Sequence, residues 1–247
     1  MPSLELGKEP DISFDELLDR FELGLREGDK ASVLRLRQFY DVLNLRLLWQ
    51  GEEIDKRGLL PLDELESAVE HKENLPKSVI DFLWDYEGDG RLAHFPMLLS
   101  HYLLEQERET SGFLRDYFRF EREWRLILSA FRAKQLGLDL AEVFKEEEES
   151  DPMIVSLMAN KDAAQFAMPY GYTDLEKALS QSVDNPMEMY QAFAQFRFER
   201  IREMTLGELL SLDWLLGYTV RLSVVLEWNE MQARNEEELL SNSRRYG

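Results

Sequence analysis

The sequence contains no cysteine and only three histidines, His71, His94 and His101. The absence of cysteine excludes zinc–thiolate sites, iron–sulfur clusters, thiol nucleophiles and disulfides. The small number of histidines argues against a histidine-rich metal site. A chain of 247 residues can bury a sizeable core without such cross-links.

Basic residues are scarce relative to acidic ones. The chain has 29 Lys and Arg against 49 Asp and Glu, which gives a formal net charge of −20. A surface of this charge repels nucleic-acid phosphates and anionic lipid headgroups, and no cluster of basic residues offsets it. We therefore expect no nucleic acid as a partner and no direct docking on a membrane surface.

Residues that favour strands and turns are also few. Leucine occurs 42 times, whereas Val, Ile and Thr occur 10, 6 and 4 times, with 13 Gly and 8 Pro. This composition predicts an all-α fold without β-sheet. The N-terminus lacks the basic start and apolar run of a targeting signal. The most apolar stretch, 212–228, contains Asp213, Arg221 and Glu227, so we expect a buried helix there and not a membrane span.

Capping and breaking residues predict where the helices begin and end. Ser13 and Glu16 form a capping-box pattern that predicts a helix from residue 13 to about 26, with Gly28 as its stop. A helix over 30–49 should end at Gly51. We expect further helices over 61–72, 76–86, 152–167, 173–181, 186–203 and, capped by Thr205, 206–216 continuing to about 240, with a frayed tail over 241–247.

The longest predicted element covers 95–137 and carries a heptad seam. Alternating steps of four and three residues connect Leu99, Leu103, Gln106, Thr110, Phe113, Tyr117, Phe120, Trp124, Ile127 and Phe131. The seam predicts one long helix that Ser111-Gly112 either kinks or divides into two. A single helix would exceed about 50 Å at ~1.5 Å per residue and would suit an elongated molecule.

An internal repeat is the most specific feature of the sequence. The segment 118–122, Phe-Arg-Phe-Glu-Arg, recurs unchanged at 196–200. A weaker copy precedes them, because Tyr40-Asp41 followed by Leu47-Leu48 matches Phe120-Glu121 followed by Ile127-Leu128. The repeat predicts three related helical units within one continuous architecture, over 1–80, 81–150 and 151–247.

Each repeat places an aromatic–acid pair on a helix. We expect the aromatic side chain in the apolar stripe and the acid beside it. Glu121 should pair with Arg125, and Glu199 with Arg202, because these residues lie four and three positions apart on a helix. These features indicate packing and architecture, not catalysis.

Other candidate sites are weak. Asp85-x-Glu87-x-Asp89-Gly90-x-Leu92 resembles the first eight positions of a calcium-binding loop, but the twelfth position is Pro96, which cannot supply the bidentate carboxylate. We interpret it as an acidic turn. His94 and His101 are seven residues apart, too far to share a metal ion without a ligand between them.

Residues 146–149 form an acidic run that is typical of a solvated loop or helix end. The tryptophans, Trp49, Trp84, Trp124, Trp214 and Trp228, fall on or beside apolar stripes, where we expect most of them to pack in the core and one or two to be available to a partner. Phosphate-loop, dinucleotide, zinc-protease and serine-hydrolase motifs are absent from the sequence. We therefore expect no catalytic, cofactor-binding or metal-binding residues.

Two short motifs resemble a known family. Asp41-x-x-Asn44-Leu45-Arg46 resembles the recurrent Asp-x-x-Asn-Leu-Arg signature of the C-type subunit, the central-stalk socket, of the archaeal/vacuolar-type rotary ATPases. Arg132-Ala133-Lys134-x-x-Gly137 is similar to the Arg-Ala-Lys-x-x-Gly of the same proteins. Segments 2–7 and 12–17 resemble a bacterial family of uncharacterised proteins encoded among V-type ATPase genes and regarded as standing in for this socket.

This resemblance implies an all-helical, funnel-shaped protein without a catalytic site of its own. It would lie on the cytoplasmic side of the membrane and couple the rotor shaft of a V/A-type ATPase to the proteolipid ring, meeting the membrane only through the ring. The charge of −20 could serve docking against basic patches on shaft or ring. Two alternatives stay open: a free-standing helical scaffold or regulatory protein, and a helical protein whose cavity holds a small molecule or an acyl chain.

Overall fold

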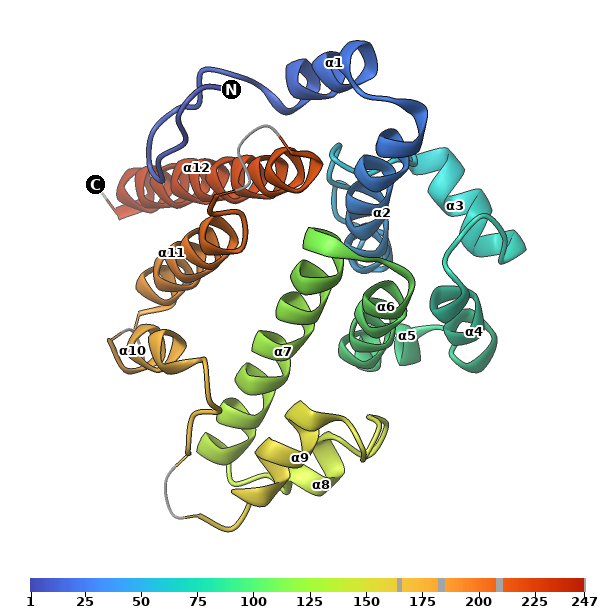
Figure 1. Ribbon diagram of the computed structural model, residues 1–247. Coiled ribbons are helices and arrows are strands. Elements are labelled where there is room, and N and C mark those ends of the chain that lie inside the picture. The colour runs from blue at the N-terminus through green and yellow to red at the C-terminus, as the bar shows by residue number, and fades with distance from the viewer. Residues whose placement is uncertain (164–165, 182–184, 208–210, 247) are drawn as a thin grey trace. The chain divides into compact units, whose positions relative to one another are not determined.

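The computed structural model describes residues 1–163, 166–181, 185–207 and 211–246. In these residues it contains helices and no strand, which confirms the predicted all-α class (Figure 1). The helices are α1 (Phe14–Gly24), α2 (Glu27–Gln50), α3 (Leu62–His71), α4 (Lys77–Asp85), α5 (Asp89–Ala93), α6 (Phe95–Glu109), α7 (Gly112–Gln135), α8 (Leu140–Val143), α9 (Pro152–Ala159), α10 (Thr173–Gln181), α11 (Pro186–Met204) and α12 (Leu212–Tyr246).

The helices form two compact units, Ser32–Thr173 and a second one made of Met1–Ala31 with Asp174–Gly247. The first unit contains most of α2 together with α3 to α9, and the second contains α1 and α10 to α12. The second unit is therefore assembled from the two ends of the chain. The three-unit organisation expected from the repeat stays a prediction.

Several helix boundaries follow the capping signals. Ser13 caps α1 in a reciprocal capping box with Glu16, at 3.1 and 2.9 Å. Pro61 and Pro76 stand at the N-caps of α3 and α4, and Gly51, with φ 71°, follows the end of α2. Gly28 does not act as the expected stop, because it lies in the first turn of α2.

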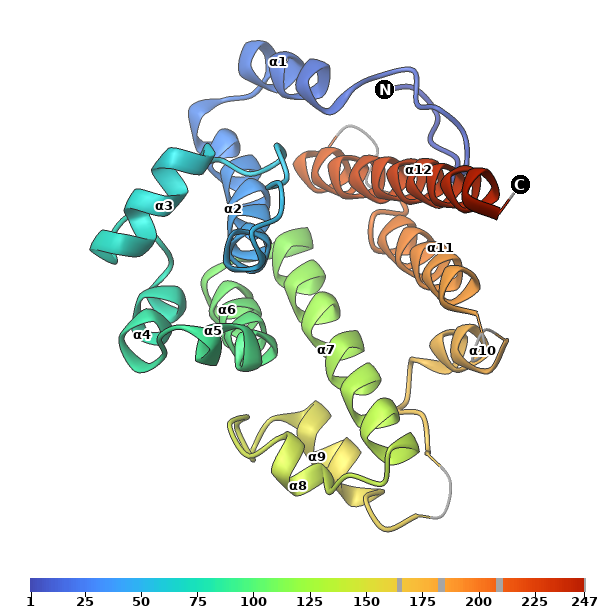
Figure 2. The same cartoon turned by 180° about the vertical axis from the view of Figure 1, so that it is seen from behind.

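Of the two outcomes expected for 95–137, a kink or a division at Ser111-Gly112, the structure has the division, into α6 and α7. Thr110 and Ser111 have extended backbone conformations, and Gly112 has φ 59°, so the chain leaves α6 and starts α7 in a new direction. The two helices pack against each other, as both views show (Figures 1 and 2). The heptad seam is mostly buried on both sides of the break: Leu99, Leu103, Gln106, Phe113, Tyr117, Phe120 and Ile127 are all buried.

An aromatic cluster joins α2, α6 and α7 in the first unit. The Phe39 ring lies 6.1–6.3 Å from the rings of Tyr102, Tyr117 and Phe118, and all four side chains are buried. Such pairs stabilise by about 0.5–1.5 kcal/mol each beyond the apolar area that they bury. The cluster fixes the face of α7 that carries the first full copy of the repeat.

In the second unit, α12 packs against α11 and α1. The apolar stretch 212–228 forms the first half of α12, where Leu216, Leu222 and Val225 are buried. None of the helices in the described ranges combines the length and apolar composition that spanning a bilayer requires.

Four expected boundaries differ near the C-terminus. Thr205 does not open a helix; it ends α11, and its hydroxyl donates to the Ile201 and Arg202 carbonyls. The next helix begins at Leu212 and runs to Tyr246, through the tail expected to fray. Asn160 ends α9 at residue 159 instead of 167. Positions 164–165 and 208–210, which fall within two of the expected helices, lie outside the described residues.

Candidate functional site

The three aromatic–acid pairs lie on α2, α7 and α11. Their acids are Asp41, Glu121 and Glu199, and their neighbouring aromatic residues, Tyr40, Phe120 and Phe198, are all buried. The aromatic side chains therefore occupy the apolar stripe, as the sequence predicts. The surroundings of the three acids differ, and this difference defines the candidate site.

Asp41 on α2 fixes the loop that follows the helix. Its Oδ1 accepts the backbone N–H groups of Leu59 and Leu60 at 2.7 and 3.0 Å. Burial raises the pKa of Asp41 to about 6, although these two N–H groups act to lower it. The carboxyl group is thus enclosed by protein and serves the fold.

Asn44, the next residue of the Asp-x-x-Asn-Leu-Arg motif, holds the same loop. Its amide accepts from the N–H of Asp55 at 2.8 Å and donates to the carbonyl of Asp55 at 2.9 Å. Gly58 closes over both side chains, because a Cβ there would lie 2.5 Å from Asp41 Oδ1 and 2.9 Å from Asn44 Nδ2. Leu45 is buried and Arg46 is exposed, so Arg46 is the motif residue that faces solvent.

The second motif, Arg132 to Gly137, ends α7. Gly137 has φ 69°, and the N–H of Leu138 donates to the carbonyl of Ala133 at 2.8 Å, which is the pattern of a glycine-terminated helix. Lys134 Nζ donates to the carbonyl of Ala163 at 2.5 Å. This motif stops the helix and attaches the following segment to it.

Glu121 on α7 is completely buried. Its carboxylate accepts from Trp124 Nε1 at 3.0 Å and from Arg125 Nη1. The predicted pair of Glu121 with Arg125 is confirmed, and Trp124 adds a neutral donor that the charge pattern alone did not indicate.

Arg122, the last residue of the same copy, is the centre of a buried ion cluster. Its guanidinium donates to Ser100 at 3.0 Å, to Asp151 at 2.7 Å and to Glu147 at 2.8 Å. The Arg122 side chain is 2% exposed and that of Glu147 is 7% exposed. Asp151 also caps α9 through its other oxygen, which accepts the N–H groups of Met153 and Ile154.

This cluster corrects the interpretation of the acidic run 146–149. Glu147 points into the protein, and Glu148 pairs with Arg108 at 2.7 Å, so the run is not simply a solvated loop. A buried arginine attracts these carboxylates because an unpaired buried charge is costly. The partners are 25 and 29 residues away, beyond the reach of helix spacing rules.

The second full copy, on α11, lies in open surroundings. Glu199 pairs with Arg202 at 2.6 Å, as predicted. Arg200 lies 3.7 Å from Glu203, which is ion-pair distance and not a hydrogen bond, and its side chain is 30% exposed.

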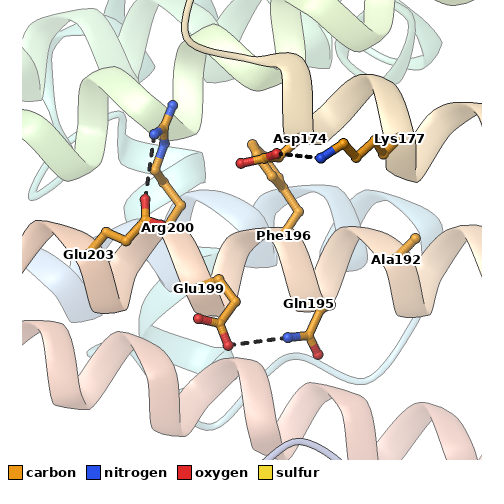
Figure 3. A pocket seen from close by; sticks show the side chains of 8 residues that line it. All are labelled: Asp174, Lys177, Ala192, Gln195, Phe196, Glu199, Arg200 and Glu203. Carbon is orange, nitrogen blue, oxygen red and sulfur yellow. Dashed lines mark hydrogen bonds and ion pairs between the residues drawn. The ribbon is translucent and has the colours of Figure 1, made fainter.

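A pocket of about 380 Å³ opens beside this copy (Figure 3). Phe196 and Arg200 project toward the side where α10 supplies Asp174 and Lys177, which pair with each other at 3.4 Å. The lining residues are Asp174, Lys177, Ala192, Gln195, Phe196, Glu199, Arg200 and Glu203. The repeat is visible in the sequence but the pocket is not, since the pocket depends on how α10 meets α11.

The weaker candidates have ordinary surroundings. Asp89 starts α5, the His94 ring stacks on Tyr86 at 4.3 Å, and His101 Nε2 lies 3.0 Å from the carbonyl of Glu146. Across the described part of the chain, no three His, Cys, Asp or Glu side chains are grouped so that they could hold a metal ion.

The five tryptophans differ in how far they are buried. Trp49, Trp124, Trp214 and Trp228 are half-buried. Trp84 is 69% exposed, and the ammonium of Lys72 lies 3.6 Å from its ring centroid. Four tryptophans thus pack partly against the core, and Trp84 is the one that is exposed to solvent.

Comparison with known proteins places the chain among relatives of unknown function. It is 28% identical over 236 residues to an uncharacterised protein of Chlamydia trachomatis, with 92% of this chain and 89% of the relative covered. A Chlamydia muridarum protein is 25% identical (92% and 88% covered), and a Chlamydia pneumoniae protein is 29% identical (78% and 75% covered); both are described as uncharacterised. No solved structure matches. A family model described as "Protein of unknown function (DUF2764)" matches residues 1–242, and the chain therefore belongs to the DUF2764 family.

Proposed function

We propose that this protein is a non-catalytic central-stalk subunit of a V/A-type ATPase, which couples the rotor shaft to the membrane proteolipid ring. The observation that carries the proposal is the placement of the two motifs that resemble the central-stalk socket. Asp41 and Asn44 clasp a loop to α2, and Arg132 to Gly137 end α7. Both motifs thus support a rigid helical frame and contribute no reactive group.

A coupling subunit needs stiffness more than chemistry. Torque passes through it only if its helices keep their positions under load. The buried ion cluster around Arg122 connects α7 to α6 and to the start of α9. The aromatic cluster connects α2 to α6 and α7. Extensive fixed contacts of this kind suit force transmission.

The charge of the protein supports a partner with basic surfaces. A net charge of −20 accelerates association with a positively charged partner and suppresses contact with acidic ones. The protein would work on the cytoplasmic face of the membrane, held there by the other subunits. Exposed Arg46, the solvent-facing residue of its motif, is a candidate contact with shaft or ring.

The leading alternative is a free-standing helical scaffold or regulator. The same frame and the same acidic surface would serve it equally well, and the two functions differ only in the partner. The third possibility is a helical protein whose cavity holds a small molecule or an acyl chain. The pocket beside α11 disfavours an acyl chain, because five of its eight lining residues are charged.

Affinity purification separates the two leading functions. The tagged protein is isolated gently from its native membranes, and the co-purifying proteins are quantified by mass spectrometry. Near-stoichiometric recovery of shaft, catalytic-head and proteolipid subunits supports the proposal. Recovery of the protein alone or with unrelated partners contradicts it and favours the scaffold. An Arg46→Gln variant tests the motif contact, with Arg26→Gln, another exposed arginine, as the control.

A further inference from the structure

A groove of about 360 Å³ runs between α4 and α6, which lie side by side in the first unit (Figures 1 and 2). The α6 residues along it include Met97, His101, Glu105 and Glu109, which are four positions apart and therefore form one stripe on the helix. The stripe is about 18 Å long at ~1.5 Å per residue. The full lining is Lys77, Ser78, Asp81, Phe82, Asp85, Tyr86, Met97, Leu98, His101, Glu105, Glu109 and Glu146.

The floor of the groove is apolar. Phe82 and Leu98 are buried, and Tyr86 and Met97 are half-buried beside them. The Tyr86 ring lies 4.8 Å from the Phe82 ring, and the Tyr86 hydroxyl lies 3.9 Å from the Met97 sulfur. Such a floor can hold an apolar side chain or the stem of a long cationic one.

Carboxylates outnumber cations along the groove. Its lining contains one lysine, Lys77, and five acids, Asp81, Asp85, Glu105, Glu109 and Glu146. Two of the acids are neutralised, because Asp81 pairs with Lys77 and Glu109 pairs with Arg35 at 2.9 Å. The other three have no ion pair in the part of the chain that the structure describes, so the groove carries a local excess of negative charge.

The three unpaired acids come from segments far apart in the sequence. Glu105 on α6 has a structural task, since it accepts the backbone N–H of Ser78 at 2.7 Å in the first turn of α4. Asp85 on α4 and Glu146 before α9 are exposed. Within the described residues, neither of these two side chains makes an ion pair or a hydrogen bond.

The stability of α4 does not account for Asp85. This residue is the last one of α4, and the final turn of that helix contains no basic residue. A negative charge at a helix C-terminus is unfavourable because the helix dipole is negative at that end. A carboxylate that opposes its own helix and has no partner within the protein suits contact with another molecule.

The distribution of the acids indicates an extended cationic partner. Over the described ranges, no three His, Cys, Asp or Glu side chains are grouped closely enough to hold a metal ion, so the carboxylates of the groove are too dispersed for a single cation. A second copy of this chain would bring the same net charge of −20 and would be repelled. Charge complementarity over an apolar floor therefore favours a basic, amphipathic segment of another protein.

We propose that the groove between α4 and α6 binds a basic amphipathic helix of a partner protein, about three turns long. Its lysine or arginine side chains face Asp85 and Glu146, and an apolar side chain of the same helix packs on Phe82 and Met97. This inference goes beyond the proposed function and does not need it, because any partner with such a helix would use the same groove.

A synthetic peptide provides the probe. It has about 15 residues, consists of Ala, Lys and Leu, and carries lysines four positions apart with leucines on the same helix face. The fluorescein-labelled peptide is titrated with the full-length protein at physiological ionic strength, and binding is followed by fluorescence anisotropy. We expect saturable binding that weakens at least about tenfold when Asp85→Asn and Glu146→Gln are combined, without a loss of thermal stability.

A matched pair of substitutions controls for the overall charge. Glu52→Gln combined with Glu53→Gln removes the same charge from two exposed residues of the same unit that lie outside the groove lining, and binding should stay within about twofold of wild type. Lys77→Gln leaves Asp81 without its partner and should strengthen binding several-fold. Met97→Gln makes the floor polar without a change in charge and should weaken binding several-fold.

Three results would overturn the proposal. The first is the absence of saturable binding. The second is an equal loss of affinity in the groove pair and in the control pair, which would mean that the peptide responds only to net charge. The third is equal affinity for a peptide in which alanine replaces the leucines, because the apolar floor would then play no part. The outcome is independent of which proteins co-purify with the chain, so it is distinct from the test of the proposed function.

Discussion

The segment Phe-Arg-Phe-Glu-Arg lies in α7 and again in α11, with the same sequence and different surroundings. On α7 its glutamate and its last arginine are buried, whereas on α11 both side chains are partly exposed. In both helices the glutamate pairs with an arginine three or four residues later. Local sequence therefore determines the short-range pair, and the distant chain determines whether the face is closed.

One copy of the motif therefore stabilises the fold, whereas the other copy is accessible at the surface. In the closed copy, three polar partners from other elements surround Arg122. In the open copy, the corresponding arginine lines a pocket. Variants at matched positions should therefore have unequal effects on stability.

The largest effect is expected at Arg122. Replacing it by Gln leaves Glu147 and Asp151 as neighbouring carboxylates without their buried cation, which should lower the free energy of unfolding by about 3–5 kcal/mol. Urea unfolding followed by circular dichroism measures this loss. Adding Glu147→Gln and Asp151→Asn should restore part of it; a triple variant no more stable than the single one would show that the ion cluster is not the cause.

The stability of the protein should depend on pH through Asp41, the acid of the weaker repeat copy on α2. The pKa of Asp41 is about 6 in the folded protein because the group is buried, and it is near 3.8 when unfolded. The folded state therefore holds the proton more tightly between pH 4 and 6, and stability falls as the pH rises through this window, by up to about 2–3 kcal/mol. Above pH 6 this contribution is constant.

An Asp41→Asn variant isolates this contribution. Both N–H bonds end on Oδ1, so asparagine can keep them without a charge. The variant should match wild type near pH 4 and exceed it in stability near pH 7. A stability difference that does not change between these pH values would contradict the buried-carboxyl account.

A smaller effect is expected at Gly58. An alanine there would press its Cβ against Asp41 and Asn44 and should cost about 1–3 kcal/mol. Gly28→Ala in α2 is the matched control, since its Cβ would meet no atom within 4 Å, and it should stabilise by roughly 0.5–1 kcal/mol. Thermal unfolding of the two variants measures both changes in stability. Equal effects would contradict the prediction, because the loop after α2 would then accommodate the extra Cβ without cost.

The smallest effect is expected at Glu199. Its pair with Arg202 is exposed, with side-chain exposures of 39% and 54%, so Glu199→Gln should change stability by only about 0–1 kcal/mol. The matched Glu121→Gln removes the buried negative charge that pairs with Arg125 and should cost roughly 1–3 kcal/mol. Chemical unfolding of the two variants measures both losses of stability. A larger loss for Glu199→Gln than for Glu121→Gln would contradict the prediction.

Local features of the fold could be predicted because they depend on neighbouring residues. The capping box of Ser13 and Glu16 is confirmed, as are the Glu121–Arg125 and Glu199–Arg202 pairs. The division at Ser111-Gly112 is one of two predicted outcomes, and the extended backbone there confirms it. Thr205 has the residue type of a helix start, but its hydroxyl reaches back to Ile201 and ends α11.

Long-range features could not be predicted in this way. The acidic run 146–149 looks solvated in the sequence, since nothing in its spacing points to Arg122. Gln106 sits at a polar position of the heptad seam, and its acceptor receives a bond from Arg35, 71 residues away. The pocket beside α11 needs α10 as its second wall. These contacts arise from how helices pack, which a single sequence does not encode in any short pattern.

The most direct test of the closed and open copies is a side-by-side urea unfolding of Arg122→Gln and Arg200→Gln. The account predicts that the first variant loses at least about 3 kcal/mol, and that the second stays within about 1 kcal/mol of wild type. Equal losses in the two variants would contradict it, because the arginine of α11 would then be as essential to the fold as the arginine of α7.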